Sequence, residues 1–201
     1  MKPIDQDNLI SEPGVRFGRT VVLPSAESLF SHRVDAIVAP ANRRGVMGVG
    51  TAGLVRLEGG QEIEREAMER APHTPGTVVV TTAGKLAERG THAIIHAVVA
   101  DALGSPTRKD TVRDAMTAIL ETADREKVRS IAIPALTSGQ TSSSLQSEMV
   151  FLIMIEEIVA YLRRFTSRLD RIVLICTDER EARRLDHTLA EARRMWWGLR
   201  V

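Results

Sequence analysis

The sequence contains a single cysteine, Cys176, and aromatic residues make up only 3% of it. One cysteine excludes a disulfide bond within the chain. Because Cys176 ends the apolar run IVLIC, we expect it to be a buried structural thiol and not a catalytic nucleophile.

An excess of charge of one sign and a long apolar run are also missing. The 27 Lys and Arg residues nearly balance the 26 Asp and Glu residues, so the net charge of +1 implies no general attraction to nucleic acid or to a membrane. The longest apolar run, Met149 to Ile155, is too short to cross a bilayer, and the polar N-terminus shows no signal peptide. We therefore expect a cytoplasmic protein that does not enter a membrane.

The histidines show no metal-binding pattern. His96 lies in an apolar strand, where a hydrogen-bonded core histidine is more common than a catalytic base. The others have no cysteine or histidine at ligand spacing, and we expect neither a metal nor a cofactor. These others are His32, His73, His92 and His187.

Predicted strands and helices alternate through most of the 201 residues, a length that suits one domain with a good core. We expect a polar N-terminal arm over residues 1–14 and a single domain over residues 15–201. Several strands are apolar throughout, which indicates a sheet covered by helices on both faces. The predicted strands are 15–23, 34–39, 77–82, 93–99, 130–135 and 171–177. The predicted helices are a short one within 24–33 that has Ser25 as its N-cap, 51–70 with a break at Gly59 and Gly60, 108–127, 145–164 and 179–197.

A glycine-rich loop follows the predicted strand 34–39, which we expect Pro40 to end. Strand, glycine loop and helix N-terminus together form an arrangement that binds phosphate through backbone N–H groups and the helix dipole. The string GxGxxG occurs at Gly48, Gly50 and Gly53, but the loop is too long for a dinucleotide fingerprint and no acidic ribose ligand follows. A plain connection between strand and helix is the alternative.

A second loop rich in small and hydroxyl residues, LTSGQTSSS at 136–144, follows the predicted strand SIAIPA. In sheets of this kind ligands lie outside the carboxyl ends of the strands, where two connections diverge. The two loops together are suited to hold two linked phosphates.

Five segments, taken in order, resemble the macro domain, the module that recognises ADP-ribose and its derivatives. These segments are DAIVAPAN, GVG, TTAGKL, AIIHAVV and SIAIPALTSG. The resemblance covers about residues 15–189. It implies a three-layer αβα sandwich with a mixed central sheet of about six strands. It also implies a structural turn at Thr81, Gly84 and Leu86.

The resemblance implies a ligand site made of four stretches. Asn42 matches the asparagine that hydrogen-bonds the distal ribose, which makes it the candidate catalytic residue. The glycine loop and the second loop, in which Thr137, Ser138 and Gly139 match the STG of the family pattern, would hold the diphosphate through backbone N–H groups. The implied ligand-binding residues are Ser28 and Leu29; Asn42, Gly48, Val49, Gly50, Thr51 and Ala52; Thr137, Ser138, Gly139, Gln140 and Thr141; and Thr177 and Asp178.

The sequence departs from the family pattern at several of these positions. Ala39 replaces the family's first asparagine, and Ser28 stands where an acidic residue contacts adenine. Thr141 and Thr177 stand where aromatic residues often close over the ribose and stack on adenine. Ala52 stands where some members carry a catalytic aspartate. The residues that would bind the diphosphate therefore match the family pattern better than the residues that would contact adenine or act in catalysis.

Two functions follow from this pattern. The first is binding of ADP-ribose or of an ADP-ribosylated protein, with weak ADP-ribosyl hydrolase activity that lacks the usual aspartate. The second is a degenerate macro domain that serves as a scaffold or assembly module without binding nucleotide.

The last predicted helix ends with two tryptophans, Trp196 and Trp197, which predict a homo-oligomer formed through that helix.

Overall fold

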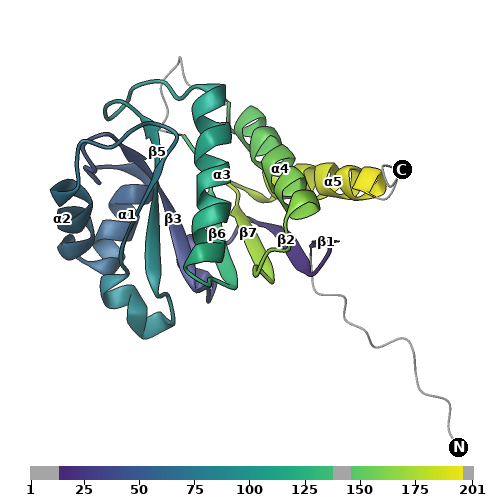
Figure 1. Ribbon diagram of the computed structural model, residues 1–201, viewed down its shortest axis with the longest axis horizontal. Coiled ribbons are helices and arrows are strands. Elements are labelled where there is room, and N and C mark those ends of the chain that lie inside the picture. The colour runs from purple at the N-terminus through teal and green to yellow at the C-terminus, as the bar shows by residue number, and fades with distance from the viewer. Residues whose placement is uncertain (1–13, 138–145, 197–201) are drawn as a thin grey trace, which may run out of the picture.

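A mixed sheet of seven strands forms the centre of the computed structural model, which describes residues 14–137 and 146–196. Its strand order is β1-β2-β7-β6-β3-β5-β4 (Figure 1). The five inner strands are parallel, and the two edge strands are antiparallel to their neighbours. The strands are β1 Val15–Phe17, β2 Thr20–Ser25, β3 Ala36–Asn42, β4 Val78–Thr82, β5 Ala93–Ala100, β6 Ser130–Pro134 and β7 Arg171–Ile175.

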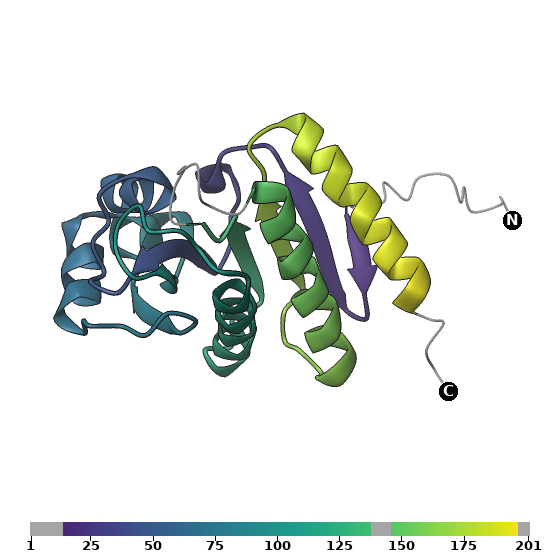
Figure 2. The ribbon, with the colours of Figure 1, turned by 90° about the horizontal axis from the view of Figure 1, so that it is seen from above.

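Helices cover both faces of the sheet, as the sequence predicts. In Figure 1, α1 and α2 lie at one end of the molecule and α5 at the other, and Figure 2 shows α3 and α4 side by side between them. The helices are α1 Gly50–Gly59, α2 Gln61–Glu69, α3 Lys109–Arg125, α4 Ser147–Arg164 and α5 Glu179–Trp196, with short 3₁₀ helices η1 Leu29–Ser31 and η2 Gly84–Arg89.

Two apolar clusters, one on each face of the sheet, form the core. Successive residues of β3 alternate between them: Ala36 and Val38 belong to the cluster that contains residues of α3, α4 and α5, while Ile37 and Ala39 belong to the cluster that contains residues of α1 and η2. Because both faces are buried, the inner strands are apolar at most positions, and most of their polar residues stand at the strand ends. The predicted three-layer αβα sandwich is confirmed.

Buried polar and thiol groups also behave as the sequence indicates. His96 is 1% exposed, and its Nε2 lies 2.9 Å from Thr81 Oγ1. Cys176 is buried, and this burial raises the pKa of its thiol to about 12, which leaves it a poor nucleophile.

No helix among the described residues is both long enough and apolar enough to cross a membrane.

The predicted single strand over residues 15–23 is wrong, since it is a hairpin of β1 and β2. Phe17 pairs with Thr20, so Gly18 and Arg19 form a two-residue turn in which Gly18 has a φ of +61°. A positive φ at this position favours glycine, which explains why glycine interrupts an otherwise strand-like run. This hairpin supplies the seventh strand.

Two further local predictions are wrong. Pro40 does not end its strand, because β3 continues to Asn42. Since β3 pairs with β6 only at Ala36 and Ile37, its later part tolerates a residue without an N–H group. Ser25 does not cap a helix either, because it is the last residue of β2; Ser28 caps the 3₁₀ helix η1 instead.

Candidate functional site

The predicted site residues follow four neighbouring parallel strands, β2, β7, β6 and β3. Their carboxyl ends therefore lie along one edge of the sheet. Asn42 ends β3, Thr137 follows β6, Thr177 follows β7 and Ser28 follows β2. At the usual spacing of strands, this row spans roughly 14 Å. The fold thus places all four stretches on the same edge.

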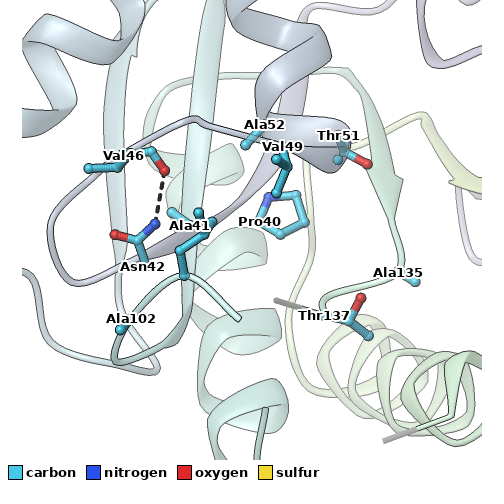
Figure 3. A pocket seen from close by; sticks show the side chains of 12 residues that line it. Pro40, Ala41, Asn42, Val46, Val49, Thr51, Ala52, Ala102, Ala135 and Thr137 are labelled. Atoms are coloured by element: carbon cyan, nitrogen blue, oxygen red, sulfur yellow. Dashed lines mark hydrogen bonds between the residues drawn. The ribbon is translucent and has the colours of Figure 1, made fainter. Parts of the chain in front are cut away.

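A pocket of about 260 Å³ opens at the β6 and β3 end of this edge (Figure 3). Six of the predicted residues line it: Asn42, Val49, Gly50, Thr51, Ala52 and Thr137. The loop after β5 adds Ala102 and Leu103, which the sequence did not suggest. The pairing of β5 with β3 brings this loop to the site. Gly48 is exposed beside the pocket, where a Cβ would meet only Leu103, at 3.5 Å.

The N-terminus of α1 forms one wall of the pocket. Its N-cap, Val49, is extended and makes no side-chain capping bond, and the first turn contains no acidic residue. The first N–H group bonded back into the helix is that of Gly53, which donates to Val49 O at 3.2 Å. The N–H groups of Gly50, Thr51 and Ala52 therefore have no partner within the helix. Together with the helix dipole, they favour an anion at this point.

Asn42 is 5% exposed, and both ends of its amide hold the loop that follows it. Nδ2 donates to Val46 O at 2.9 Å (Figure 3), and Oδ1 accepts from Arg44 N at 3.0 Å. An amide has two N–H donors and a carbonyl oxygen with two lone pairs, so one donor and one acceptor site remain. Asn42 thus shapes the pocket and keeps capacity for one more polar contact.

The described lining residues contain no carboxylate, imidazole or other group that can act as a general base near neutral pH. Ala52, 8% exposed, stands where the family pattern allows a catalytic aspartate. The lining is instead built from backbone N–H groups, the hydroxyls of Thr51 and Thr137, the Asn42 amide and apolar side chains. Such a wall suits the binding of a polar anion better than acid–base chemistry.

The other described residues of the predicted site do not line this pocket. Ser28 Oγ accepts from Phe30 N at 3.3 Å, and Leu29 is buried. Thr177 and Asp178 are exposed at the start of α5 and take part in capping that helix. The structure therefore places these four residues on the same edge but gives them local structural contacts.

Part of the predicted site lies outside the described residues: Ser138, Gly139, Gln140 and Thr141. Within the described ranges, no group of three His, Cys, Asp or Glu side chains is arranged to hold a metal ion.

The sequence matches the macro domain family over residues 38–148, more than half of the chain. This chain therefore belongs to the macro domain family. An uncharacterized protein of Aquifex aeolicus is 41% identical to it over 146 residues, which cover 72% of this chain and 83% of that protein. The O-acetyl-ADP-ribose deacetylase of Klebsiella pneumoniae is 29% identical over 154 residues, which cover 74% of this chain and 85% of that enzyme.

Solved structures share the fold at lower identity. A Trypanosoma brucei macrodomain in complex with ADP-ribose aligns with a TM-score of 0.71 and 21% identity, covering 85% of this chain and 69% of that one. The match to an Aeropyrum pernix protein covers 63% of that protein, and the match to a longer Mycobacterium tuberculosis protein covers 28% of it.

Proposed function

We propose that this protein binds ADP-ribose, free or attached to a protein, in the pocket between β3, β6 and α1. The observation that carries the proposal is the uncapped N-terminus of α1, whose first three residues line the same pocket as Asn42 and Thr137. The diphosphate would accept hydrogen bonds from the N–H groups of Gly50, Thr51 and Ala52. The remaining donor of Asn42 would contact the distal ribose.

The adenosine half of the ligand would extend along the strand ends towards β7 and β2. In this arrangement the adenine lies near Thr177 and Asp178 on one side and Ser28 and Leu29 on the other. None of these residues is aromatic, and a lost stacking contact costs on the order of 1–3 kcal/mol of affinity. We therefore expect the diphosphate to supply most of the affinity.

Two comparisons support this proposal. The Trypanosoma brucei macrodomain was solved in complex with ADP-ribose, and the Klebsiella pneumoniae relative is named for action on O-acetyl-ADP-ribose. Both ligands contain the diphosphate for which the α1 end of the pocket is suited.

Calorimetric titration with ADP-ribose, AMP and ribose 5-phosphate tests the proposal. Only ADP-ribose carries a diphosphate, so we expect it to bind more tightly than the other two. At about 100 times its dissociation constant it should stabilise the fold by about 2.7 kcal/mol. No heat and no shift in melting temperature at millimolar ADP-ribose would contradict the proposal and favour the scaffold function.

We expect any hydrolysis of ADP-ribosylated protein to be slow and to depend on Asn42. General acid–base catalysis typically contributes about 10²- to 10⁴-fold, and the described pocket lining has no group for it. The assay compares ADP-ribose release by the parent, Asn42→Ala and Ala52→Asp proteins. Fast turnover that survives Asn42→Ala would place the catalytic group elsewhere.

Three expectations from the sequence stay predictions: a cytoplasmic location, one domain over residues 15–201 and a homo-oligomer formed through the last helix. Trp196 packs against Phe17 of the same chain, with ring centroids 5.4 Å apart, while Met195 beside it is 64% exposed. Trp197 lies outside the described residues. Light scattering on the parent and a Met195→Ala, Trp197→Ala variant tests the oligomer, and a monomer in both cases would rule it out.

A further inference from the structure

A second groove, of about 580 Å³, adjoins the pocket on the side away from β6. The two cavities share four lining residues, among them Asn42 and Leu103. The groove adds Arg43, Arg44, Pro72 and Asp101. A ligand that fills the pocket can therefore continue into the groove past Asn42.

The backbone that carries the two arginines is fixed on both sides. Arg43 N donates to Ala100 O at 3.1 Å, and Arg43 O accepts from His73 N at 2.8 Å. Arg44 N donates to Asn42 Oδ1 at 3.0 Å. Since these bonds use only the main chain of Arg43 and Arg44, their side chains can be replaced without removing them.

The charges of the groove are unbalanced. Arg43 Nη1 lies 3.5 Å from Asp101 Oδ1, and both side chains are exposed. The Arg44 guanidinium makes no ion pair or hydrogen bond with any residue in the described ranges, and no other acidic residue lines the groove. An exposed guanidinium beside a pocket wall is a ready partner for a carboxylate.

We propose that this groove binds an acidic segment of the protein whose ADP-ribosyl group occupies the pocket. This inference rests on the proposed function, because it places the attached protein where the distal ribose would leave the pocket beside Asn42. Carboxylates of the segment would pair with Arg44 and, in competition with Asp101, with Arg43. Leu103, 52% exposed, and Pro72 offer apolar surface to the aliphatic parts of the same segment.

The test uses two peptides that carry the same ADP-ribosyl group, one flanked by glutamates and the other by glutamines. Fluorescence anisotropy measures the affinity of each peptide, and calorimetry measures that of free ADP-ribose. We expect the parent protein to prefer the glutamate peptide on the order of fivefold, which is reasonable for partly exposed ion pairs. The preference should shrink as salt is added.

Arg44→Glu should abolish or reverse this preference while it changes the affinity for free ADP-ribose by less than about twofold. The matched control is Arg183→Glu, a charge reversal on the exposed surface of α5, which should leave the preference intact. Equal affinity of the parent for the two peptides would overturn the inference but leave ADP-ribose binding standing. Failure of free ADP-ribose to bind would instead overturn the proposed function and this inference with it.

A third ligand distinguishes a protein segment from a phosphate. ADP-ribose 1″-phosphate places an anion at the same exit without any peptide. If Arg44→Glu weakens this ligand while the parent shows no preference between the peptides, the groove would bind phosphate and the inference would be wrong.

Discussion

Two helices, α1 and α5, begin at the same edge of the sheet, yet their N-termini are completed in opposite ways. At α1, no described side chain bonds to the free N–H groups. At α5, Asp178 Oδ1 accepts from Glu181 N at 2.8 Å, and Glu181 Oε2 accepts from Thr177 N at 2.8 Å. Ser147 Oγ also donates to Glu181, which is only 4% exposed.

The difference shows which helix end is available to a ligand. A capping carboxylate satisfies the free N–H groups and neutralises the positive end of the helix dipole, so α5 offers little to an anion. An uncapped end leaves the N–H groups without partners and the positive end of the dipole without a compensating charge. It also lacks the stability that a cap would add. The open end of α1 is the end at which we propose that the diphosphate binds.

The largest effect that we expect is a loss of stability in acid on the side of the sheet that α1 and α2 cover, compared with the side that α5 covers. His96 follows Ile94 by two residues in β5, and Ile94 belongs to the cluster that contains α1 and α2 residues, so His96 faces the same side of the sheet. Burial lowers the pKa of His96 from 6.5 to about 4. The unfolded chain therefore binds a proton between these values and the folded chain does not, so stability is lost as the pH falls from 6.5 to 4. This difference corresponds to about 3 kcal/mol.

Denaturant unfolding between pH 7 and pH 4 measures this effect. His96→Leu should make the free energy of unfolding depend less on pH. In this variant Thr81 Oγ1 would still donate to Thr82 O. The matched control is His187→Gln, which replaces an exposed histidine of α5. Hydrogen exchange at pH 5 should show α2 and β4 losing protection before α5. A profile that His96→Leu leaves unchanged would rule out this explanation.

The second prediction concerns a variant that adds an N-cap to α1. Val49→Asp places a capping carboxylate at the N-terminus of α1, where the backbone is already extended. The loss of charge-assisted hydrogen bonds, about 1.5–3 kcal/mol, should weaken ADP-ribose binding by about 10- to 100-fold. The free protein should gain about 1 kcal/mol of stability.

Calorimetry and thermal unfolding of the same Val49→Asp sample measure both changes. Val49→Ala, which adds no cap, is the control and should leave both quantities nearly unchanged. A variant that is stabilised and still binds normally would show that the ligand does not use these N–H groups.

The third prediction concerns a variant that removes the N-cap of α5. Asp178→Ala removes the oxygen that accepts from Glu181 N, and it should destabilise the protein by about 1 kcal/mol. Asp178→Asn retains an oxygen at this position and should recover most of the loss. Chemical denaturation compares the three proteins. An unchanged midpoint for Asp178→Ala would mean that the cap does not contribute to stability.

The part of the pocket formed by the glycine loop and the N-terminus of α1 could be predicted from the sequence because it depends on local features. A strand, a run of glycines and a helix without an acidic first turn are all visible at Val34 to Val55. The contacts of Asn42 could not be predicted, since they depend on how the loop folds back to Val46 and Arg44. The same is true of Ala102 and Leu103, which only the pairing of β5 with β3 brings to the pocket.

Two local signals were present in the sequence and pointed to the observed structure. Asp178 and Glu181 have the three-residue spacing of a capping box, which predicts a closed helix end. Gly18, inside the strand-like run VRFGRTVVL, is a signal for a hairpin turn. The layers of the fold, by contrast, followed from the alternation of apolar strands with amphipathic helices, because that pattern requires helices on both faces.

The most direct test of the open helix end is an NMR titration that follows the backbone amides of both helix N-termini. On addition of ADP-ribose, the amides of Gly50, Thr51 and Ala52 should show the largest shifts, because the diphosphate would accept their hydrogen bonds. The amides of Arg180 and Glu181 in α5 should shift less than these three, since that end is already capped and would have only the adenine near it, not the diphosphate. A complex that forms while Gly50, Thr51 and Ala52 stay unshifted would contradict the account.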